Sequence, residues 1–443
     1  MKELFGLAER VIGGILPFSL LLCGGVWLTV RTGFYQLRCL PKAIRYAFHG
    51  MFERKKGAFS PFRSACTALS ATVGTGNIAG VASAVSLGGA GAVFWMWVSA
   101  FFGMCVKSAE IALGIRFRER GKEGCTGGPM YIIRNGLGKR FSPLASLFCI
   151  MALIACFCSG AITQTNAVAA LCGSGAARWI LGAFFAGFCF VAMRGGKKRI
   201  GAINETLVPI MATLYLIFCA VAVFVHRSAL PGAFSAIVSG AFAPRAVTGG
   251  AVGSLISTVA AGASRGVFSN EAGLGTAAMA HAAAESEDSA QTLYGIFEVF
   301  MDTIVICTLT ALTILTAGVT IEYGTQASTE LVRAALFQSY GAVSGILLAG
   351  MMCLFSITSV IGWGFYGRIC LSFLPVAGKE GLFAAVYSLC CVAGAVFPAD
   401  TAWRLAAVST GGMLCINLPA VWMLSETAVL VLKEGTKLDQ RKN

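Results

Sequence analysis

Long apolar segments alternate with short polar segments along nearly the whole chain. Segments close to the 20 or so residues that a helix needs to cross a bilayer lie at 11–30, 65–85, 91–113, 145–171, 177–193, 203–226, 250–281, 291–318, 343–374, 381–397 and 402–432. Segment 381–397 is short for a span, whereas segment 343–374 is long enough to tilt strongly. The pattern predicts an all-α polytopic membrane protein with eleven transmembrane helices.

Two of these segments are interrupted near their middle. The first interruption is Gly74-Thr75-Gly76-Asn77, and the second is GVFSNEAGLG at 266–275. Glycine costs a helix about 1 kcal/mol relative to alanine, and broken backbone at membrane depth is tolerated only where it lines an enclosed cavity. Close helix packing would also explain the glycines, but it does not require Asn77, Asn270 or Glu271. We therefore predict two broken helices with a substrate site between them, where freed N–H and C=O groups bind a carboxylate and a cation.

The spacing of the segments predicts an internal repeat. After the first span, five spans begin near residues 65, 91, 145, 177 and 203, and five more begin near 250, 291, 343, 381 and 402. The offset stays close to 200 residues, and an odd number of spans per half inverts the second copy, as in many secondary transporters. The chain then divides into an extra N-terminal span with a basic amphipathic segment (1–64), a first repeat (65–226), an extracellular connector (227–249), a second repeat (250–432) and a cytoplasmic tail (433–443).

Charge sets the expected orientation. The chain has 443 residues, 57% hydrophobic and 12% charged, with a net charge of +14. One set of alternating loops holds 25 Lys and Arg residues and the other holds 7, so the positive-inside rule places the N-terminus outside and the C-terminus in the cytoplasm of a plasma (inner) membrane protein. Because the excess charge follows the loops, we expect no nucleic-acid partner. Segment 31–64 interleaves aromatic and basic residues and is typical of an amphipathic helix, with Pro41 at its start, on the anionic cytoplasmic leaflet.

Catalytic and nucleotide motifs are missing from the sequence. The 17 cysteines lie mostly inside apolar segments and show no zinc-ligand spacing, so they are interpreted as small packing residues. Neither a GxxxxGK[ST] nor an HExxH motif occurs. We expect neither an enzyme nor a bound cofactor, but a secondary transporter. A channel-like or sensor protein of the same architecture is the alternative.

Three motifs carry a family resemblance. The stretches GGAGAVFWMWVSAFFG (88–103), VGTGNIAGVA (73–82) and GVFSNEAGLG (266–275), the last followed by AHAAAES (280–286), resemble the alanine or glycine:cation symporter family. The resemblance extends from about residue 10 to 430, and the family is similar in fold to the leucine-transporter superfamily. It implies import of alanine or glycine driven by a sodium gradient, or by protons in some members, with alternating access to a midplane site.

The resemblance also implies a substrate site and a cation site. At the first break, Gly74 and Asn77 flank the Thr75 and Gly76 N–H groups that would bind the substrate carboxylate. The implied sodium ligands are the carbonyls of Ser70, Val73 and Phe355 and the hydroxyls of Thr358 and Ser359. Asn77 matches a ligand of a second cation site, for which the seventh core span offers no clear partner.

Further pocket residues follow from the family pattern. Gln164 matches a glutamine that bonds the amino group, and Phe268 matches an aromatic cover, with Ser269 and Asn270 beside it in the second break. Trp363 and Gly364 match the wall of a pocket for a small side chain. Apart from the family, Gln164 would suit an interhelical hydrogen bond and Trp363 core packing.

Charged residues occur inside several apolar segments. Lys107 and Glu110 are three residues apart and are expected to neutralise each other on one helical face. Arg265 and Glu271 flank the second break, where they would either pin it or form a gate. The histidines are expected at surface or interfacial positions: His49, His226 and His281.

Glu298 and Asp302 form a like-charge pair four residues apart in the seventh core span. Such a pair needs a partner or a proton. Hydrogen bonding to the neighbouring helix break is the favoured interpretation, and proton coupling is the alternative.

Overall fold

The computed structural model describes residues 11–12, 16–52, 59–121, 124–173, 175–243, 248, 255–286, 289–324, 329–375 and 378–440. These residues are almost entirely helical, apart from loops and one antiparallel hairpin of β1 (Glu119–Gly121) and β2 (Gly124–Thr126). Seven of the described helices are long and apolar enough to cross a membrane, and up to nine spans result if each of two bent helix pairs counts as one. The prediction of a helical polytopic membrane protein is confirmed, whereas the count of eleven spans and the inverted repeat stay predictions.

The first half of the chain contains both bent pairs. The first joins the N-terminal helix to a helix at 85° to it, and the second contains the predicted break and bends by 56°. In chain order the helices are α2 (Leu16–Arg31), α3 (Tyr35–Phe52), α4 (Pro61–Thr72), η2 (Thr75–Asn77), α5 (Ala79–Gly88), α6 (Gly91–Arg116), α7 (Pro129–Tyr131), η3 (Ile132–Leu137), η4 (Lys139–Phe141), α8 (Ser142–Ala155), η5 (Cys156–Ile162), α9 (Thr163–Ala169), α10 (Ala176–Arg194) and α11 (Gly196–Val225).

The second half holds the other predicted break, between α14 and α15. Its helices are η6 (Arg227–Ala229), α12 (Leu230–Phe242), α14 (Leu255–Asn270), α15 (Thr276–Ala282), η7 (Ser289–Thr292), α16 (Leu293–Val299), η8 (Phe300–Cys307), α17 (Thr308–Thr316), α18 (Thr329–Tyr340), η9 (Gly341–Val343), α19 (Ser344–Phe373), α20 (Glu380–Val396), α21 (Asp400–Met423) and α22 (Ser425–Gln440). Every predicted apolar segment overlaps at least one helix.

Three details differ from the sequence prediction. Segment 402–432 is not one helix, because the chain turns at Leu424 between α21 and α22. The segment 227–249 contains helix α12 rather than only a connector. Pro41 lies inside α3 instead of at its start, because the turn through Gly33 and Phe34, both with positive φ, starts the helix at Tyr35.

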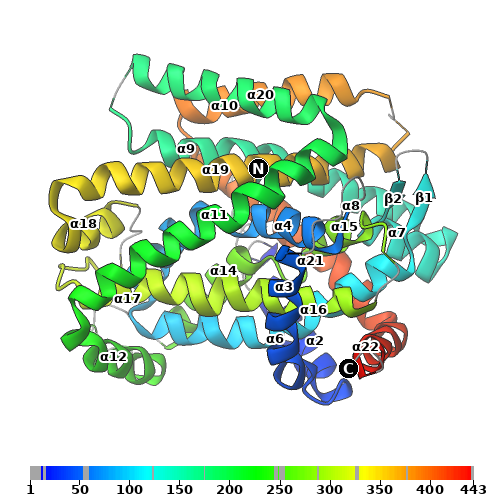
Figure 1. The fold of residues 1–443 in the computed structure, drawn as a ribbon, viewed down its shortest axis with the longest axis horizontal. Helices are drawn as coiled ribbons and strands as arrows, with labels where there is room; N and C mark the ends of the chain where they lie inside the picture. Colours follow the sequence, from blue (N-terminus) through cyan, green and yellow to red (C-terminus); the bar gives the residue numbers. More distant parts are fainter. Residues whose placement is uncertain are drawn as a thin grey trace.

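The helices pack closely around α6, α14, α4 and α19, and the last three hold many of the predicted site residues (Figure 1). Small residues permit this contact, as is common between membrane helices. At Gly262 of α14, an added Cβ would lie 2.1 Å from the Ala92 carbonyl oxygen of α6. Helix α3 runs across the direction of the long helices α11, α17 and α19 (Figure 1).

Candidate functional site

The first predicted break is present between α4 and α5. Helix α4 ends at Thr72, and only the short turn η2 separates its end from α5. The Gly74 N–H donates to the Asn77 Oδ1 at 2.9 Å, so the asparagine satisfies a donor freed by the break. A Cβ on Gly74 would lie 2.6 Å from the Ser359 Oγ of α19. Glycine is therefore required here by the close approach of α19.

The second predicted break is present between α14 and α15. Glu271, Gly273 and Gly275 have φ of +53°, +91° and +80°, a left-handed conformation that is costly for residues with a Cβ. The Asn270 Oδ1 accepts the Ala272 N–H at 3.0 Å and fixes the turn from within. Asparagine, glutamate and two glycines thus form the interruption.

Two charged residues of α6 bind opposite ends of this second break. The Lys107 Nζ donates to the Asn270 carbonyl oxygen at 3.0 Å, and the Glu110 Oε1 accepts the Gly275 N–H at 2.9 Å. The Glu110 Oε1 also accepts from the Asn417 Nδ2. Among the described residues no direct ion pair joins Lys107 to Glu110, because each of them is held by the backbone of the break.

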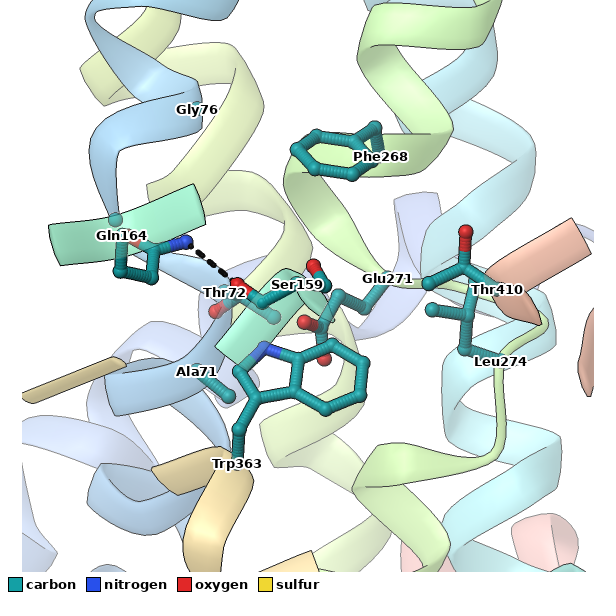
Figure 2. Close-up of a pocket in the computed structure, with 11 residues that line it drawn as sticks. Ala71, Thr72, Gly76, Ser159, Gln164, Phe268, Glu271, Leu274, Trp363 and Thr410 are labelled. Atoms are coloured by element: carbon teal, nitrogen blue, oxygen red, sulfur yellow. Dashed lines mark hydrogen bonds between the residues drawn. The ribbon is translucent and has the colours of Figure 1, made fainter. Parts of the chain in front are cut away.

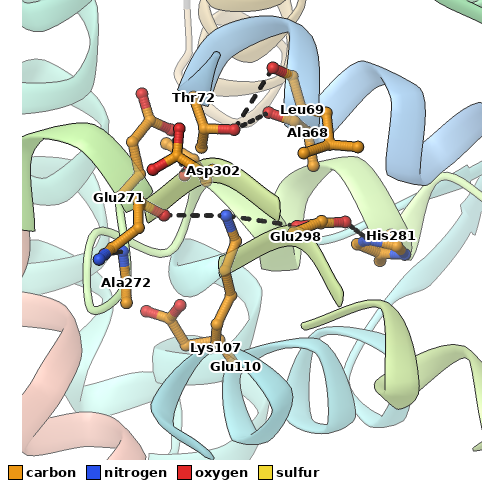
Figure 3. A network of polar contacts seen from close by, with 12 residues as sticks. Ala68, Leu69, Thr72, Lys107, Glu110, Glu271, Ala272, His281, Glu298 and Asp302 are labelled. Carbon is orange, nitrogen blue, oxygen red and sulfur yellow. Dashed lines mark hydrogen bonds and ion pairs between the residues drawn. The ribbon is translucent and has the colours of Figure 1, made fainter. Parts of the chain in front are cut away.

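Lys107 instead forms a buried ion pair with Glu298 of α16, at 3.3 Å. The other Glu298 oxygen lies 2.7 Å from the His281 Nε2 (Figure 3). Gln291 contacts the same imidazole and the His281 carbonyl oxygen. His281 is fully buried, so its expected surface position is wrong; a buried carboxylate and an amide supply the polar partners that solvent would otherwise provide.

Asp302 connects the two breaks. It lies in the π-helical segment η8 and accepts hydrogen bonds from the Asn77 Nδ2 and the Ser269 Oγ, both at 2.7 Å, and from the Thr303 Oγ1 at 2.8 Å. The Asn77 Nδ2 also lies 3.1 Å from the Ser269 Oγ. The prediction that the acidic pair hydrogen-bonds to a neighbouring break is confirmed for Asp302, which accepts a hydrogen bond from Asn77.

A small cavity lies between the breaks (Figure 2). It has a volume of about 20 Å³, measured as the space open to the centre of a water molecule, which is room for about one water. Phe268 lies on one side of the lining residues and the Trp363 indole lies on the opposite side (Figure 2). The lining residues are Ala71, Thr72, Gly74, Gly76, Ser159, Gln164, Phe268, Glu271, Leu274, Trp363 and Thr410.

Five of the expected substrate residues thus line the cavity, and the other five lie elsewhere. Thr75 is adjacent: its Oγ1 donates to the Gln164 Oε1 at 3.0 Å, and its N–H lies 3.4 Å from the same oxygen. Gly364 instead faces α10, since a Cβ there would lie 2.7 Å from the Met193 Sδ. The remaining three hold the breaks together through the contacts described above: Asn77, Ser269 and Asn270.

The expected sodium residues come from α4 and α19, which approach closely. A Cβ on Gly362 of α19 would lie 2.4 Å from the Ser70 Oγ of α4. The Thr358 Oγ1 donates to the Phe355 carbonyl oxygen at 3.0 Å. The Ser359 Oγ is buried and has no hydrogen-bond partner among the described residues, although it faces Gly74. The hydroxyls of Ser64 and Ser99 are likewise buried without a hydrogen-bond partner among the described residues.

A second, larger cavity of about 740 Å³ shares Gly76, Phe268, Leu274 and Thr410 with the first. The Phe268 ring lies 6.3 Å from the ring of Trp403. This larger cavity, here called the vestibule, is lined by three charged residues, Arg265, Asp400 and Arg404. The Arg265 Nη2 donates to the Ser83 Oγ of α5 at 3.1 Å. Arg265 therefore binds across the vestibule rather than to Glu271.

Comparison with known proteins decides the family. The model of the sodium:alanine symporter family matches residues 1–443. The chain belongs to the sodium:alanine symporter family. It is 38% identical over 452 residues to the sodium/alanine symporter AgcS of Methanococcus maripaludis, covering 100% of this chain and 98% of that protein. It is 33% identical over 441 residues to the probable sodium/glutamine symporter GlnT of Bacillus subtilis, covering 99% and 91%. An uncharacterized transporter of Haemophilus influenzae is 36% identical over 427 residues, covering 94% and 92%.

Membership of the sodium:alanine symporter family makes this chain a cation-coupled amino-acid transporter and not an enzyme. Six lining residues of the symporter cavity were not predicted as site residues: Ala71, Thr72, Ser159, Glu271, Leu274 and Thr410. Glu271 was visible as an acidic residue in a break. Ser159 and Thr410 carry no sequence signal, because the π-helical segment η5 and the approach of α21 bring them to the cavity.

Proposed function

We propose that this symporter imports a small neutral amino acid, alanine or glycine, together with sodium. The protein would lie in the plasma (inner) membrane with its N-terminus outside and its C-terminus in the cytoplasm, and it would work by alternating access between two inverted five-helix repeats. The observation that carries the proposal is the cavity between the α4–α5 and α14–α15 breaks, lined by the glycines of one break and a carboxylate of the other. At about 20 Å³ this cavity would have to widen during alternating access to admit an amino acid.

The substrate carboxylate is assigned to the first break, at the Thr75 and Gly76 N–H groups. Oriented N–H groups at a helix start favour an anion without a basic side chain, which suits a ligand that is neutral overall. The Gln164 Oε1, 3.4 Å from the Thr75 N–H, already supplies an acceptor oxygen at this position. A carboxylate would replace it, and the released Gln164 would then be able to bond the amino group.

The amino group is assigned to the Glu271 side of the cavity. The Glu271 Oε2 accepts from the Thr276 Oγ1 at 2.8 Å, which orients the carboxylate, and the residue lines the cavity. A zwitterion would therefore meet a donor-rich end and an acidic end. Phe268 and Trp363 would limit the side chain to a small one, which favours alanine and glycine over the glutamine named for one relative.

Sodium is assigned to the junction of α4 and α19. The unpartnered Ser359 Oγ supports this assignment, since a hard cation takes oxygen ligands. The ion would be held by the carbonyls of Ser70, Val73 and Phe355 and the hydroxyls of Thr358 and Ser359. A second cation beside Asn77 and Asp302 is a separate possibility, which the sodium stoichiometry of transport would test.

Reconstitution tests the proposal against a channel-like or sensor protein. Purified protein in liposomes should accumulate labelled alanine or glycine above its outside concentration when sodium is high outside, and gramicidin should abolish this accumulation. Sodium and pH gradients are imposed separately to identify the driving ion. Equilibration without accumulation would support a channel, binding without flux would support a sensor, and preferential accumulation of glutamine would contradict the assigned size selection.

A further inference from the structure

A third cavity lies where the corner between α2 and α3 meets the C-terminal helix α22. Its volume is about 210 Å³ by the same measure as above. It is lined by Thr32, Tyr35, Arg38, Cys39, Lys42, Val429, Leu432 and Lys433. Three of the eight residues are cations and none is acidic, so the cavity selects for an anion.

The uncharged polar side chains of this cavity are already satisfied. The Tyr35 hydroxyl lies 3.1 Å from the Thr292 Oγ1, and the Thr32 Oγ1 donates to the Leu28 carbonyl oxygen at 2.7 Å. The Arg38 Nη2 donates to the Thr32 carbonyl oxygen at 2.6 Å, which fixes the guanidinium at the rim and leaves it further donors. Recognition of a ligand therefore falls to the cationic groups.

The spacing of the cations also calls for an anion. Arg38 and Lys42 are four residues apart on α3, where two like charges repel and destabilise a helix. Lys433 adds a third positive charge from α22. An anion between them relieves this repulsion and joins the two helices.

The face of α3 beside the cavity is apolar and exposed. Leu37, Phe48 and Phe52 are 55%, 54% and 82% exposed, and they recur at helical spacing along one side of α3. Phe34, 49% exposed, lies in the turn just before the helix. Because α3 runs across the long helices (Figure 1), this face is suited to lie in the interfacial layer of a bilayer. With this face in the interfacial layer, the cationic cavity would lie at the depth of the lipid headgroups.

We propose that the cavity binds the phosphate headgroup of an anionic glycerophospholipid. Arg38, Lys42 and Lys433 bind the phosphate, and the apolar residues Val429 and Leu432 contact the glycerol and the first carbons of the acyl chains. The bound lipid joins α3 to α22. This site is separate from the substrate cavity and does not depend on the proposed substrate.

Native mass spectrometry of the purified full-length protein tests the site with phosphatidylglycerol and with phosphatidylcholine. The variant Arg38→Gln/Lys42→Gln/Lys433→Gln removes all three cations. Near a membrane surface each cation raises the affinity for anionic lipid about fivefold. The affinity of the triple variant for phosphatidylglycerol should therefore fall more than about twentyfold. Phosphatidylcholine binding should change little.

The matched control is Arg45→Gln/Lys139→Gln/Lys198→Gln, which removes three exposed cations outside the cavity. It should keep wild-type affinity for phosphatidylglycerol. An equal loss in both triple variants would overturn the site in favour of general surface charge. Displacement of the lipid by millimolar inorganic phosphate would overturn the lipid assignment in favour of a small free anion. If the triple variant does not fold, Lys42→Gln alone decides: unchanged lipid affinity overturns the proposal.

Discussion

Lys107 and Glu110, one turn apart on α6, bind opposite ends of the α14–α15 break. Lys107 donates to the carbonyl oxygen of Asn270, the last residue of α14. Glu110 accepts the N–H of Gly275, the residue just before α15. A cation at a helix C-terminus and an anion at a helix N-terminus are both stabilised by the helix dipole. One helix thus holds both halves of the broken one in register.

Replacing Lys107 with methionine tests this relationship. The change leaves the Glu298 carboxylate buried without its lysine, and breaking a buried ion pair costs about 3–5 kcal/mol. We expect a clearly lower unfolding temperature in detergent and loss of uptake. Glu110→Gln is the matched control, because its amide oxygen still accepts the Gly275 N–H. This variant should lose less unfolding temperature and less uptake than Lys107→Met. Wild-type stability of Lys107→Met would show that the break is held by other contacts.

Replacing Thr358 and Ser359 with alanine tests the sodium site. If both hydroxyls bind sodium, the change removes two oxygen ligands, and each hydrogen bond to a charged group is worth about 1.5–3 kcal/mol. The sodium concentration for half-maximal uptake should rise about a hundredfold or more. Ser372→Ala is the control, since its hydroxyl bonds within α19 to the Ile369 carbonyl oxygen. Unchanged sodium activation in the double variant would exclude this position for the ion.

Membrane potential gives a second measure of sodium coupling. A neutral substrate carries no charge, so every sodium ion that crosses uncompensated moves one charge. An inside-negative potential of 100 mV then contributes about 2.3 kcal/mol per ion. Uptake by wild-type proteoliposomes should rise when a potassium diffusion potential is imposed with valinomycin, and no response to potential would contradict uncompensated sodium symport.

Glu271→Gln tests recognition of the amino group. Glutamine can still accept the Thr276 hydroxyl but loses the negative charge, so alanine affinity should fall by about 1.5–3 kcal/mol. Propionate, which has the carboxylate and methyl group of alanine but no amine, should bind equally weakly to both proteins. A parallel loss for alanine and propionate would show that Glu271 supports the break rather than the amine.

Trimming Trp363 to leucine tests size selection. Trp363 lines the cavity. It also packs against η5, because a Cβ added to Gly160 of η5 would lie 2.3 Å from the Trp363 Cβ. A methylene in such a pocket is worth about 1–3 kcal/mol, so valine and leucine should gain affinity relative to alanine in a graded way. Trp179→Leu, at an exposed position of α10, is the control. A folded variant that loses alanine affinity without gaining larger substrates would make Trp363 a packing residue.

The sequence by itself determined the helical membrane class and the places where helices break. Apolar segments of spanning length must fold as helices, because the hydrocarbon layer offers no water to backbone groups. Glycines beside Asn77 and within 266–275 interrupt that pattern locally, so both breaks are readable without any knowledge of packing.

Only the tertiary structure decided which partners the buried polar residues have. Asp302 lies 225 residues from Asn77 yet binds it, and Lys107 binds Asn270, 163 residues away, instead of its neighbour Glu110. The burial of His281 and the place of Thr410 in the cavity follow from the same packing. A sequence shows which side chains need a partner, but the partner depends on which helices pack together and at what rotation about their axes.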